Sequence, residues 1–259
     1  MDSQLAALVT QAATADTPTG VPWATLLALG LAVAAGAFVQ SAIGFGMAVV
    51  AAPFVIVFAP SLMPVALLVT SFALPIGQLA QGPRDIDGRL LGWALGARLL
   101  TTPLGVAVVA VFSTRAISVL VGVLILLTVA VAVSTLRVEP TPRNAAVAGA
   151  IAGISGTAAS IGGPFFAIVL AGLRPTRVRA TLSVFFLVGS LIAIGGLASA
   201  GEFRPAQLVA GACWLPFVGL GYAAAVPLRK CLDTGGLRRA VLAFCLVAGV
   251  SVIGRALLG

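Results

Sequence analysis

The stretch GAFVQSAIGFG, residues 36–46, lies deep in apolar sequence and ends in a glycine break. A second stretch, GISGTAASIGG at residues 153–163, ends in a similar break and is followed by Pro164. The apolar segments that follow the breaks, at 46–59 and 163–173, are too short to cross a bilayer, which takes ~20 helical residues. Non-helical backbone survives at membrane depth only where protein or water satisfies it. We therefore expect two helical hairpins whose tips lie near the middle of a membrane.

The composition is that of an integral membrane protein. Of 259 residues, 60% are hydrophobic and 8% are charged, and the mean hydropathy is +1.17. Apolar runs such as Ala116 to Leu136 and Leu237 to Leu258 match the ~20 residues that a helix needs to cross a hydrocarbon core of ~30 Å. Barrel strands would alternate polar and apolar residues, and these runs do not. The chain is therefore predicted to be an all-α polytopic membrane protein.

Ten apolar segments can be drawn between charges, prolines and glycines. They cover about 22–43, 46–59, 61–81, 89–112, 115–136, 144–161, 163–173, 178–200, 205–228 and 237–258.

The basic residues of the connections are unevenly divided. If alternate connections are assigned to opposite sides, one side receives 11 basic residues and the other three. Basic residues favour the cytoplasmic side, so both termini are predicted to be extracytoplasmic, in a multi-pass protein of the cell (inner or plasma) membrane. Residues 1–21 lack the basic region of a signal peptide and are expected to form a short extracytoplasmic tail. The richer side holds Arg84, Arg89, Arg137, Arg143, Arg174, Arg177, Arg179, Arg229, Lys230, Arg238 and Arg239, and the poorer side Arg115, Arg204 and Arg255.

The two breaks belong to an internal repeat. With a shift of 117 residues, 36–46 aligns with 153–163, and the order hairpin, helix, helix, helix occurs twice. The predicted repeats span 22–136 and 144–259, with a cytoplasmic linker at 137–143. Each has five segments, so the second starts from the opposite side and the topology is inverted. Inverted repeats with equivalent breaks point to a transporter site between them, although glycine-rich apolar sequence can also align with itself by chance.

The residues around the breaks resemble a known family. Gln40-x-x-x-Gly44-Phe45-Gly46 with Pro53, and its partner Gly153-x-x-Gly156 with Gly162-Gly163-Pro164, look like the sulfite exporter TauE/SafE family of membrane permeases. The resemblance covers nearly the whole chain, including its two halves. It implies export or uptake of sulfite, of sulfonates such as sulfoacetate, or of related organosulfur anions.

The two tips could bind an anion. A half-helix that starts at the middle of a membrane directs its free N–H groups and positive dipole end into the protein, and two such starts would form an anion site without a charged side chain. The alternative role of glycine is helix packing, which we expect for Gly92-x-x-x-Gly96 and Gly149-x-x-x-Gly153. Expected substrate contacts are the backbone of Gly44, Gly46, Met47, Gly162, Gly163 and Phe165 and the side chains of Gln40, Ser41, Thr157 and Ser160.

Arg98 is the one clear charge inside a predicted segment. Its planar guanidinium suits sulfonate or carboxylate oxygens, and an intramembrane arginine is costly unless it faces a cavity or a partner. The alternatives are snorkelling toward the cytoplasmic surface and a structural bond to helix carbonyls. All seven acids lie in tails or loops: Asp2, Asp16, Asp85, Asp87, Glu139, Glu202 and Asp233.

The absence of acids from the predicted segments bears on how anion transport could be driven. Without an intramembrane carboxylate, the usual proton relay of coupled transporters is missing. An anion that leaves a cell gains ~2.3 kcal/mol per charge per 100 mV of inside-negative potential, so export needs no coupling ion. The expected function is alternating-access export of a sulfite- or sulfonate-like anion. Uptake coupled to sodium on backbone carbonyls is the alternative.

Other functions are disfavoured. The chain has no histidine, and its three cysteines form no CxxC pair, which excludes a His-ligated haem, a His-containing zinc site and a His acid–base pair. We expect no catalytic residue, metal or cofactor, and as partners only a small anion and the lipid bilayer. The +8 net charge is spread over short loops, so nucleic-acid binding is not expected. The rivals are a channel, an uptake permease for another anion, an intramembrane enzyme and a scaffold; the oligomeric state is left open.

Overall fold

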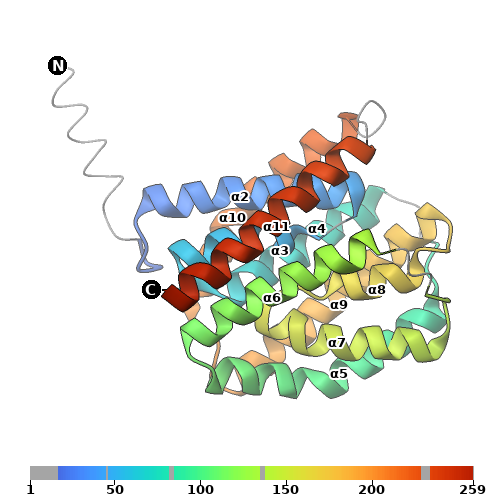
Figure 1. Cartoon of the computed structure of the whole chain (residues 1–259), viewed down its shortest axis with the longest axis horizontal. Helices are drawn as coiled ribbons and strands as arrows, with labels where there is room; N and C mark the ends of the chain where they lie inside the picture. Colours follow the sequence, from blue (N-terminus) through green and yellow to red (C-terminus); the bar gives the residue numbers. More distant parts are fainter. Residues whose placement is uncertain (1–16, 45, 82–84, 135–137, 229–233, 259) are drawn as a thin grey trace.

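The computed structural model describes residues 17–44, 46–81, 85–134, 138–228 and 234–258. Regular structure within those residues is entirely helical (Figure 1). The predicted tail at 1–21 and the predicted linker at 137–143 lie partly outside these ranges. Outside them altogether are Phe45, Arg84, Arg137, Arg229 and Lys230. The elements are α2 (Trp23–Ile43), α3 (Met47–Phe58), the 3-10 turn η1 (Pro60–Leu62), α4 (Val65–Gln81), α5 (Gly88–Val111), α6 (Thr114–Val133), α7 (Pro142–Ala159), α8 (Gly163–Leu170), α9 (Pro175–Ser199), α10 (Pro205–Leu228) and α11 (Thr234–Leu258).

The ten predicted segments correspond one to one with the ten α-helices of the described residues. Six of these helices, α2, α5, α6, α9, α10 and α11, are long and apolar enough to cross a membrane. The two segments after the breaks are short, as predicted: α3 has 12 residues and α8 has eight. At ~1.5 Å per residue these helices are about 18 and 12 Å long, so neither alone covers a hydrocarbon core.

The outer surface of the bundle is apolar. Large side chains such as Leu31, Leu100 and Val111 are 64%, 80% and 79% exposed. Trp23 and Trp93 are exposed near opposite ends, where amphipathic rings favour a membrane–water interface. Together with the six long apolar helices, this surface is that of a multi-pass membrane protein.

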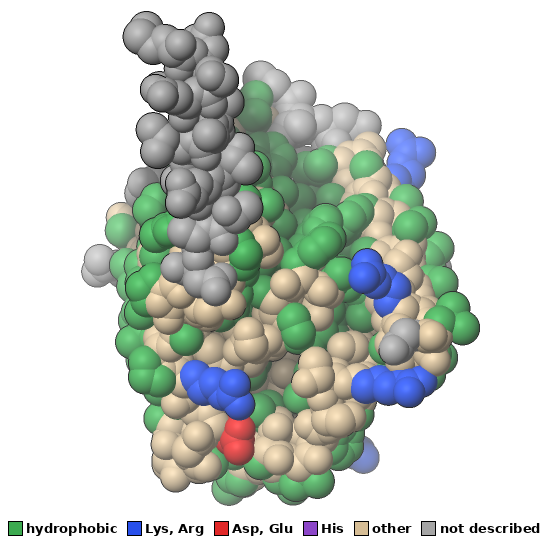
Figure 2. All heavy atoms as spheres, turned by 90° about the vertical axis from the view of Figure 1, so that its left-hand side faces the viewer, with side chains coloured by type: hydrophobic (Ala, Val, Ile, Leu, Met, Phe, Trp, Pro, Cys, Tyr) green, Lys and Arg blue, Asp and Glu red, His purple; other side chains and the backbone are tan. Residues whose placement is uncertain are grey.

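The two ends of the bundle differ in charge. In Figure 1 the start of α2, the end of α11 and the α5–α6 turn lie at the left, and the ends of α4, α6 and α8 lie at the right. We call the right-hand end the arginine-rich end; its described members are Arg89, Arg143, Arg174, Arg177, Arg179, Arg238 and Arg239. Figure 2 looks onto the opposite end, where basic side chains are scattered among apolar ones.

Small residues bring the helices into close contact. The helix pairs α5–α7, α2–α10 and α6–α11 pack extensively, as do α4–α9, α4–α10 and α5–α9. A Cβ atom built on Gly149 of α7 would lie 2.0 Å from the carbonyl oxygen of Ala94 in α5, and one on Gly221 of α10 would lie 2.1 Å from that of Ala34 in α2. Neither position has room for a side chain, so backbone-to-backbone packing joins the two halves of the chain.

The prediction of packing glycines is confirmed for one pair and wrong for the other. Gly149 and Gly153 both pack against α5. Gly92 and Gly96 are exposed, with no atom within 4 Å of a built Cβ. The reason is helical phase: α5 meets α7 through the face that holds Ala94, and residues two positions away lie on the other side of the helix.

This contrast gives a matched pair of variants. Gly149→Ala should lower the unfolding free energy by about 1–3 kcal/mol, because its methyl group must push α5 and α7 apart. Gly96→Ala should be neutral or stabilise by up to about 1 kcal/mol through helix propensity. Thermal unfolding of the purified protein in detergent measures both. Equal melting temperatures for the two variants would contradict the observed approach of α5 to α7.

Candidate functional site

The first glycine break joins α2 to α3. Gly44 ends α2 with φ 74°, and its amide donates to the Gln40 carbonyl oxygen over 2.9 Å. Gly46 has φ 104° and directly precedes α3. Both angles fall where a residue with a Cβ is strained, so the chain needs glycine at each position to reverse so tightly.

The second break joins α7 to α8. Ser160 ends α7 with φ 60°, the only positive φ of a non-glycine residue among those described. Its hydroxyl donates to the Pro64 carbonyl oxygen over 3.1 Å. The bond fixes the end of α7 against the segment that precedes α4, toward the end opposite the arginine-rich one. The predicted substrate contact Ser160 is therefore paired within the protein.

The two breaks meet. A Cβ on Gly46 would lie 3.9 Å from Cδ of Pro164, the second residue of α8. From this contact α3 runs toward the opposite end of the bundle and α8 toward the arginine-rich end (Figure 1). Two helix N-termini that are far apart in the sequence thus begin side by side in the interior.

Gln40 closes the first break. Its Oε1 accepts a hydrogen bond from the Met47 amide over 2.6 Å, and the residue is only 6% exposed. The side chain therefore caps the start of α3, and the Met47 amide, a predicted substrate donor, is already paired in this conformation. Because the oxygen faces Met47, the NH2 group of Gln40 is left as a donor.

The start of α8 is covered by an aromatic ring. A Cβ on Gly163 would lie 2.1 Å from Cζ of Phe186 in α9. Phe186 also lines the cavity described below, and Gly163 does not. Gly162 is buried nearby, and Phe165 packs against the main apolar core.

Arg98 lies beside the second break. It is 3% exposed, and its Nη1 is 3.5 Å from the Phe185 carbonyl oxygen, with the guanidinium carbon 4.9 Å from the centre of the Phe185 ring. A Cβ on Gly156 of α7 would lie 3.0 Å from its Nη2, and one on Gly189 of α9 would lie 2.1 Å from its Nη1. The guanidinium is thus enclosed by α7 and α9, so the snorkelling interpretation is wrong.

The charge of Arg98 has no acidic partner among the described residues. The described acids Asp85, Asp87, Glu139 and Glu202 all lie in connections between helices. Among the described residues, the one ion pair joins Arg177 to Asp85 over 2.8 Å, near the arginine-rich end. A buried cation without a counter-charge is costly in a bilayer, which makes this position favourable for an anion.

Four buried polar atoms have no hydrogen-bond partner among the described residues. They are Ser41 Oγ, Arg98 Nε, Thr128 Oγ1 and Thr157 Oγ1. Hydroxyls elsewhere in the helices donate to a carbonyl one turn earlier, as Thr102 does to Arg98 and Ser155 to Ile151. Buried polar groups normally find partners, so these four atoms are positions where a ligand or water would be bound favourably.

Thr128 was missed by sequence reasoning. It is fully buried in α6, and its only signal is that it interrupts the aliphatic run LVGVLILLTVAVAV at 120–133. Val131 and Ala132, three and four residues later, line the cavity. Thr128 therefore lies on the same face of α6, one turn deeper.

A cavity of about 490 Å³ reaches from the arginine-rich end to the breaks. Gln40, Gly44 and Pro164 line its inner part, and Arg179 and Arg238 also belong to its wall. Ser41, Gly46 and Met47 are buried beside the first break. Thr157 faces α5 instead, where a Cβ on Gly105 would lie 2.8 Å from it. The predicted site residues thus form two groups, one at the cavity and one behind the second break with Arg98.

The capping role of Gln40 can be tested by stability. Gln40→Met removes the acceptor of the Met47 amide and should destabilise the protein by about 1–3 kcal/mol, the cost of a buried unpaired donor. Gln78→Met is the control, because Ser183, which donates to Gln78 over 2.9 Å, also has the Arg179 carbonyl oxygen as acceptor. Thermal unfolding in detergent measures both. A Gln40→Met protein as stable as Gln78→Met would rule out the cap.

Comparison with known proteins gives a family. The family model described as "Sulfite exporter TauE/SafE" matches residues 27–252, a range that contains both breaks, Arg98 and the cavity wall. Comparisons with curated proteins and with solved structures gave no match. The family consists of membrane transporters of anions such as sulfite, and the earlier resemblance is confirmed over nearly the whole chain. The chain belongs to the TauE/SafE sulfite exporter family.

Proposed function

We propose that this protein exports sulfite or a small organosulfonate anion, such as sulfoacetate, by alternating access at a site between the two glycine breaks. One observation carries the proposal. The starts of α3 and α8 meet at the inner end of a cavity, next to a buried arginine that has no acidic partner among the described residues.

The electrostatics of this centre favour an anion. Helix N-termini carry about half a positive charge each, and unpaired amides at such ends bind sulfate- and phosphate-like groups. Arg98 adds a full positive charge beside Gly156. Its planar donors suit the oxygens of a sulfonate or sulfite. The hydroxyls of Ser41, Thr128 and Thr157 have no hydrogen-bond partner among the described residues. Ser41 and Thr128 offer neutral donors on the cavity side of the breaks, and Thr157 offers one behind the second break.

The helix packing supports an inverted repeat. In an inverted repeat, each helix of α2–α6 would correspond to the helix at the same place in α7–α11, so that α2 corresponds to α7 and α5 to α10. The packed pair α5–α7 then corresponds to α10–α2, and both pairs pack extensively. The pairs α4–α10 and α9–α5 exchange in the same way, while α4–α9 and α6–α11 map onto themselves. A two-fold relation between 22–136 and 144–259 accounts for this pattern. It also accounts for short helices that run in opposite directions from a common centre.

Alternating access is supported by the difference between the two ends. The cavity opens from the breaks toward the arginine-rich end. Toward the other end, Ser160 bonds to the Pro64 carbonyl oxygen, and Gln207 donates to the carbonyl oxygens of Ser61 and Met63 over 2.9 and 2.7 Å. With the arginine-rich end in the cytoplasm, this conformation faces inward, both termini are extracytoplasmic, and the membrane potential drives export.

The substrate is tested first by ligand-dependent stability. Sulfite, sulfoacetate, thiosulfate, taurine, sulfate and chloride are added to the purified protein, and thermal unfolding is followed. A ligand at a hundred times its Kd should add about 2.7 kcal/mol to the unfolding free energy. We expect sulfite or sulfoacetate to stabilise and chloride not to. If no organosulfur anion has an effect, the substrate assignment fails.

Arg98 is tested by flux through proteoliposomes. Arg98→Met should lower the transport rate of the stabilising anion by about 10- to 100-fold, because a charged hydrogen bond is worth about 1.5–3 kcal/mol. Arg98→Lys keeps the charge and should retain part of the rate. Arg204→Gln, which removes an arginine at the opposite end, is the control. A wild-type transport rate for Arg98→Met would mean that the substrate does not bind at Arg98. Single-channel currents would show that the protein is a channel and not a carrier.

A further inference from the structure

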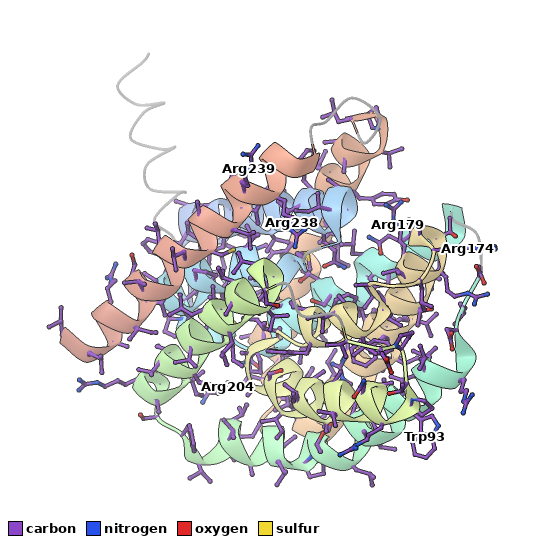
Figure 3. All side chains as sticks on the ribbon, turned by 45° about the vertical axis from the view of Figure 1, so that its right-hand side comes forward. Trp93, Arg174, Arg179, Arg204, Arg238 and Arg239 are labelled. Carbon is purple, nitrogen blue, oxygen red and sulfur yellow. The ribbon has the colours of Figure 1, made fainter. Side chains whose placement is uncertain are left out.

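We propose a second oxyanion site at the mouth of the cavity, formed by Arg179 and Arg238, which collects the anion before it reaches the breaks. This inference rests on the proposed function and adds a binding step to it. The two arginines come from α9 and α11 and both belong to the cavity wall. Figure 3 shows them at the arginine-rich end, with Arg174 and Arg239, and well away from Arg204.

The cavity wall is cationic. Among the described residues, those that line it include Arg179 and Arg238 and no acidic residue. At the same end, Arg177 is held by Asp85 over 2.8 Å, outside this wall. The other polar groups of the wall are neutral, among them Gln40, Gln78 and Ser134, and most of the remaining lining is aliphatic. Charges on low-dielectric walls concentrate ions of opposite sign, so the cavity attracts oxyanions.

Arg238 is held over the cavity by the backbone. Its Nη2 donates to the carbonyl oxygen of Ala132 in α6 over 2.5 Å, and Ala132 itself lines the cavity. A guanidinium has five N–H donors in a planar fork, so one bond to a carbonyl leaves several for a ligand. The side chain is thus positioned to bind an anion that enters between α6 and α9.

Arg179 begins a stripe that leads inward. Arg179, Leu182 and Phe186 are three and four residues apart on α9, and all three line the cavity. Residues at this spacing share one helix face, so the stripe runs from the mouth to the ring that covers Gly163. An anion that leaves Arg179 therefore moves along an apolar face toward the start of α8.

Neighbouring arginines provide matched controls. Arg174 and Arg239 are exposed at the same end but do not belong to the cavity wall. Replacing either pair removes two charges from the same membrane surface. The cavity pair is Arg179→Gln with Arg238→Gln, and the control pair is Arg174→Gln with Arg239→Gln.

The experiment measures initial transport rates of sulfite and sulfoacetate in proteoliposomes of purely zwitterionic lipid. The cavity pair should raise KM by about tenfold with a maximal rate within about twofold of wild type, because the site raises local anion concentration. Wild-type KM should rise between ~20 and ~300 mM inert salt, where screening becomes strong, and the cavity pair should lose this dependence. The control pair should behave as wild type. Equal effects of the two pairs would overturn the proposal.

Two further arms separate other outcomes. Anionic lipid headgroups carry the same oxyanion chemistry, so the rates are repeated in vesicles with about one-third anionic lipid. If the KM values of the cavity pair and the control pair differ only in the vesicles with anionic lipid, the arginines bind lipid headgroups, and the proposal is overturned. If wild type transports neither anion, the proposed function fails on its own. In that case sulfate at low salt should still raise the melting temperature of wild type and of the control pair, but not that of the cavity pair. Equal shifts in melting temperature for all three proteins would overturn the proposed second site.

Discussion

A backbone that breaks inside a membrane must have its polar groups satisfied by the protein, and this constraint organises the whole structure. The chain breaks twice, after α2 and after α7; Gly46 at the first break and Ser160 and Gly162 at the second are buried, while Gly44 opens onto the cavity. At the first, the Gln40 side chain caps the Met47 amide; at the second, Ser160 bonds to the Pro64 carbonyl oxygen. Because each break needs protein around it, the two lie against one another, and the long helices enclose them.

Close helix packing makes that enclosure possible. Without a hydrophobic effect between helices in lipid, contact depends on small residues that let backbones approach. Gly149 against Ala94 and Gly221 against Ala34 bring α7 to α5 and α10 to α2, so each half of the chain is packed on a helix of the other. The same closeness leaves room for one large polar side chain, that of Arg98, between Gly156 and Gly189. The positions of the Arg98 guanidinium and of the two helix N-termini therefore both depend on this close helix packing.

The candidate site could be predicted in part. Gln40, Gly44 and Arg98 were identified because a glycine break or a charge is unusual inside apolar sequence, and the structure places them at or beside the meeting point of the breaks. Thr128 was missed because a single threonine in an apolar helix carries no sign of which way it faces. Phe186 was missed for the same reason. Gly92 and Gly96 were assigned to packing by spacing alone, and they lie on the exposed face of α5.

The sequence alone determined the membrane class, the ten helical segments, the two short helices and the family, because transfer of apolar runs into lipid and the breaking of helices at glycine are local properties of the chain. Only the tertiary structure decided which helix faces meet. Rotation of a helix by half a turn leaves its hydropathy unchanged but exchanges the residues that it buries. That rotation decides that Arg98 lies beside Gly156 and that Arg179 and Arg238 share a cavity.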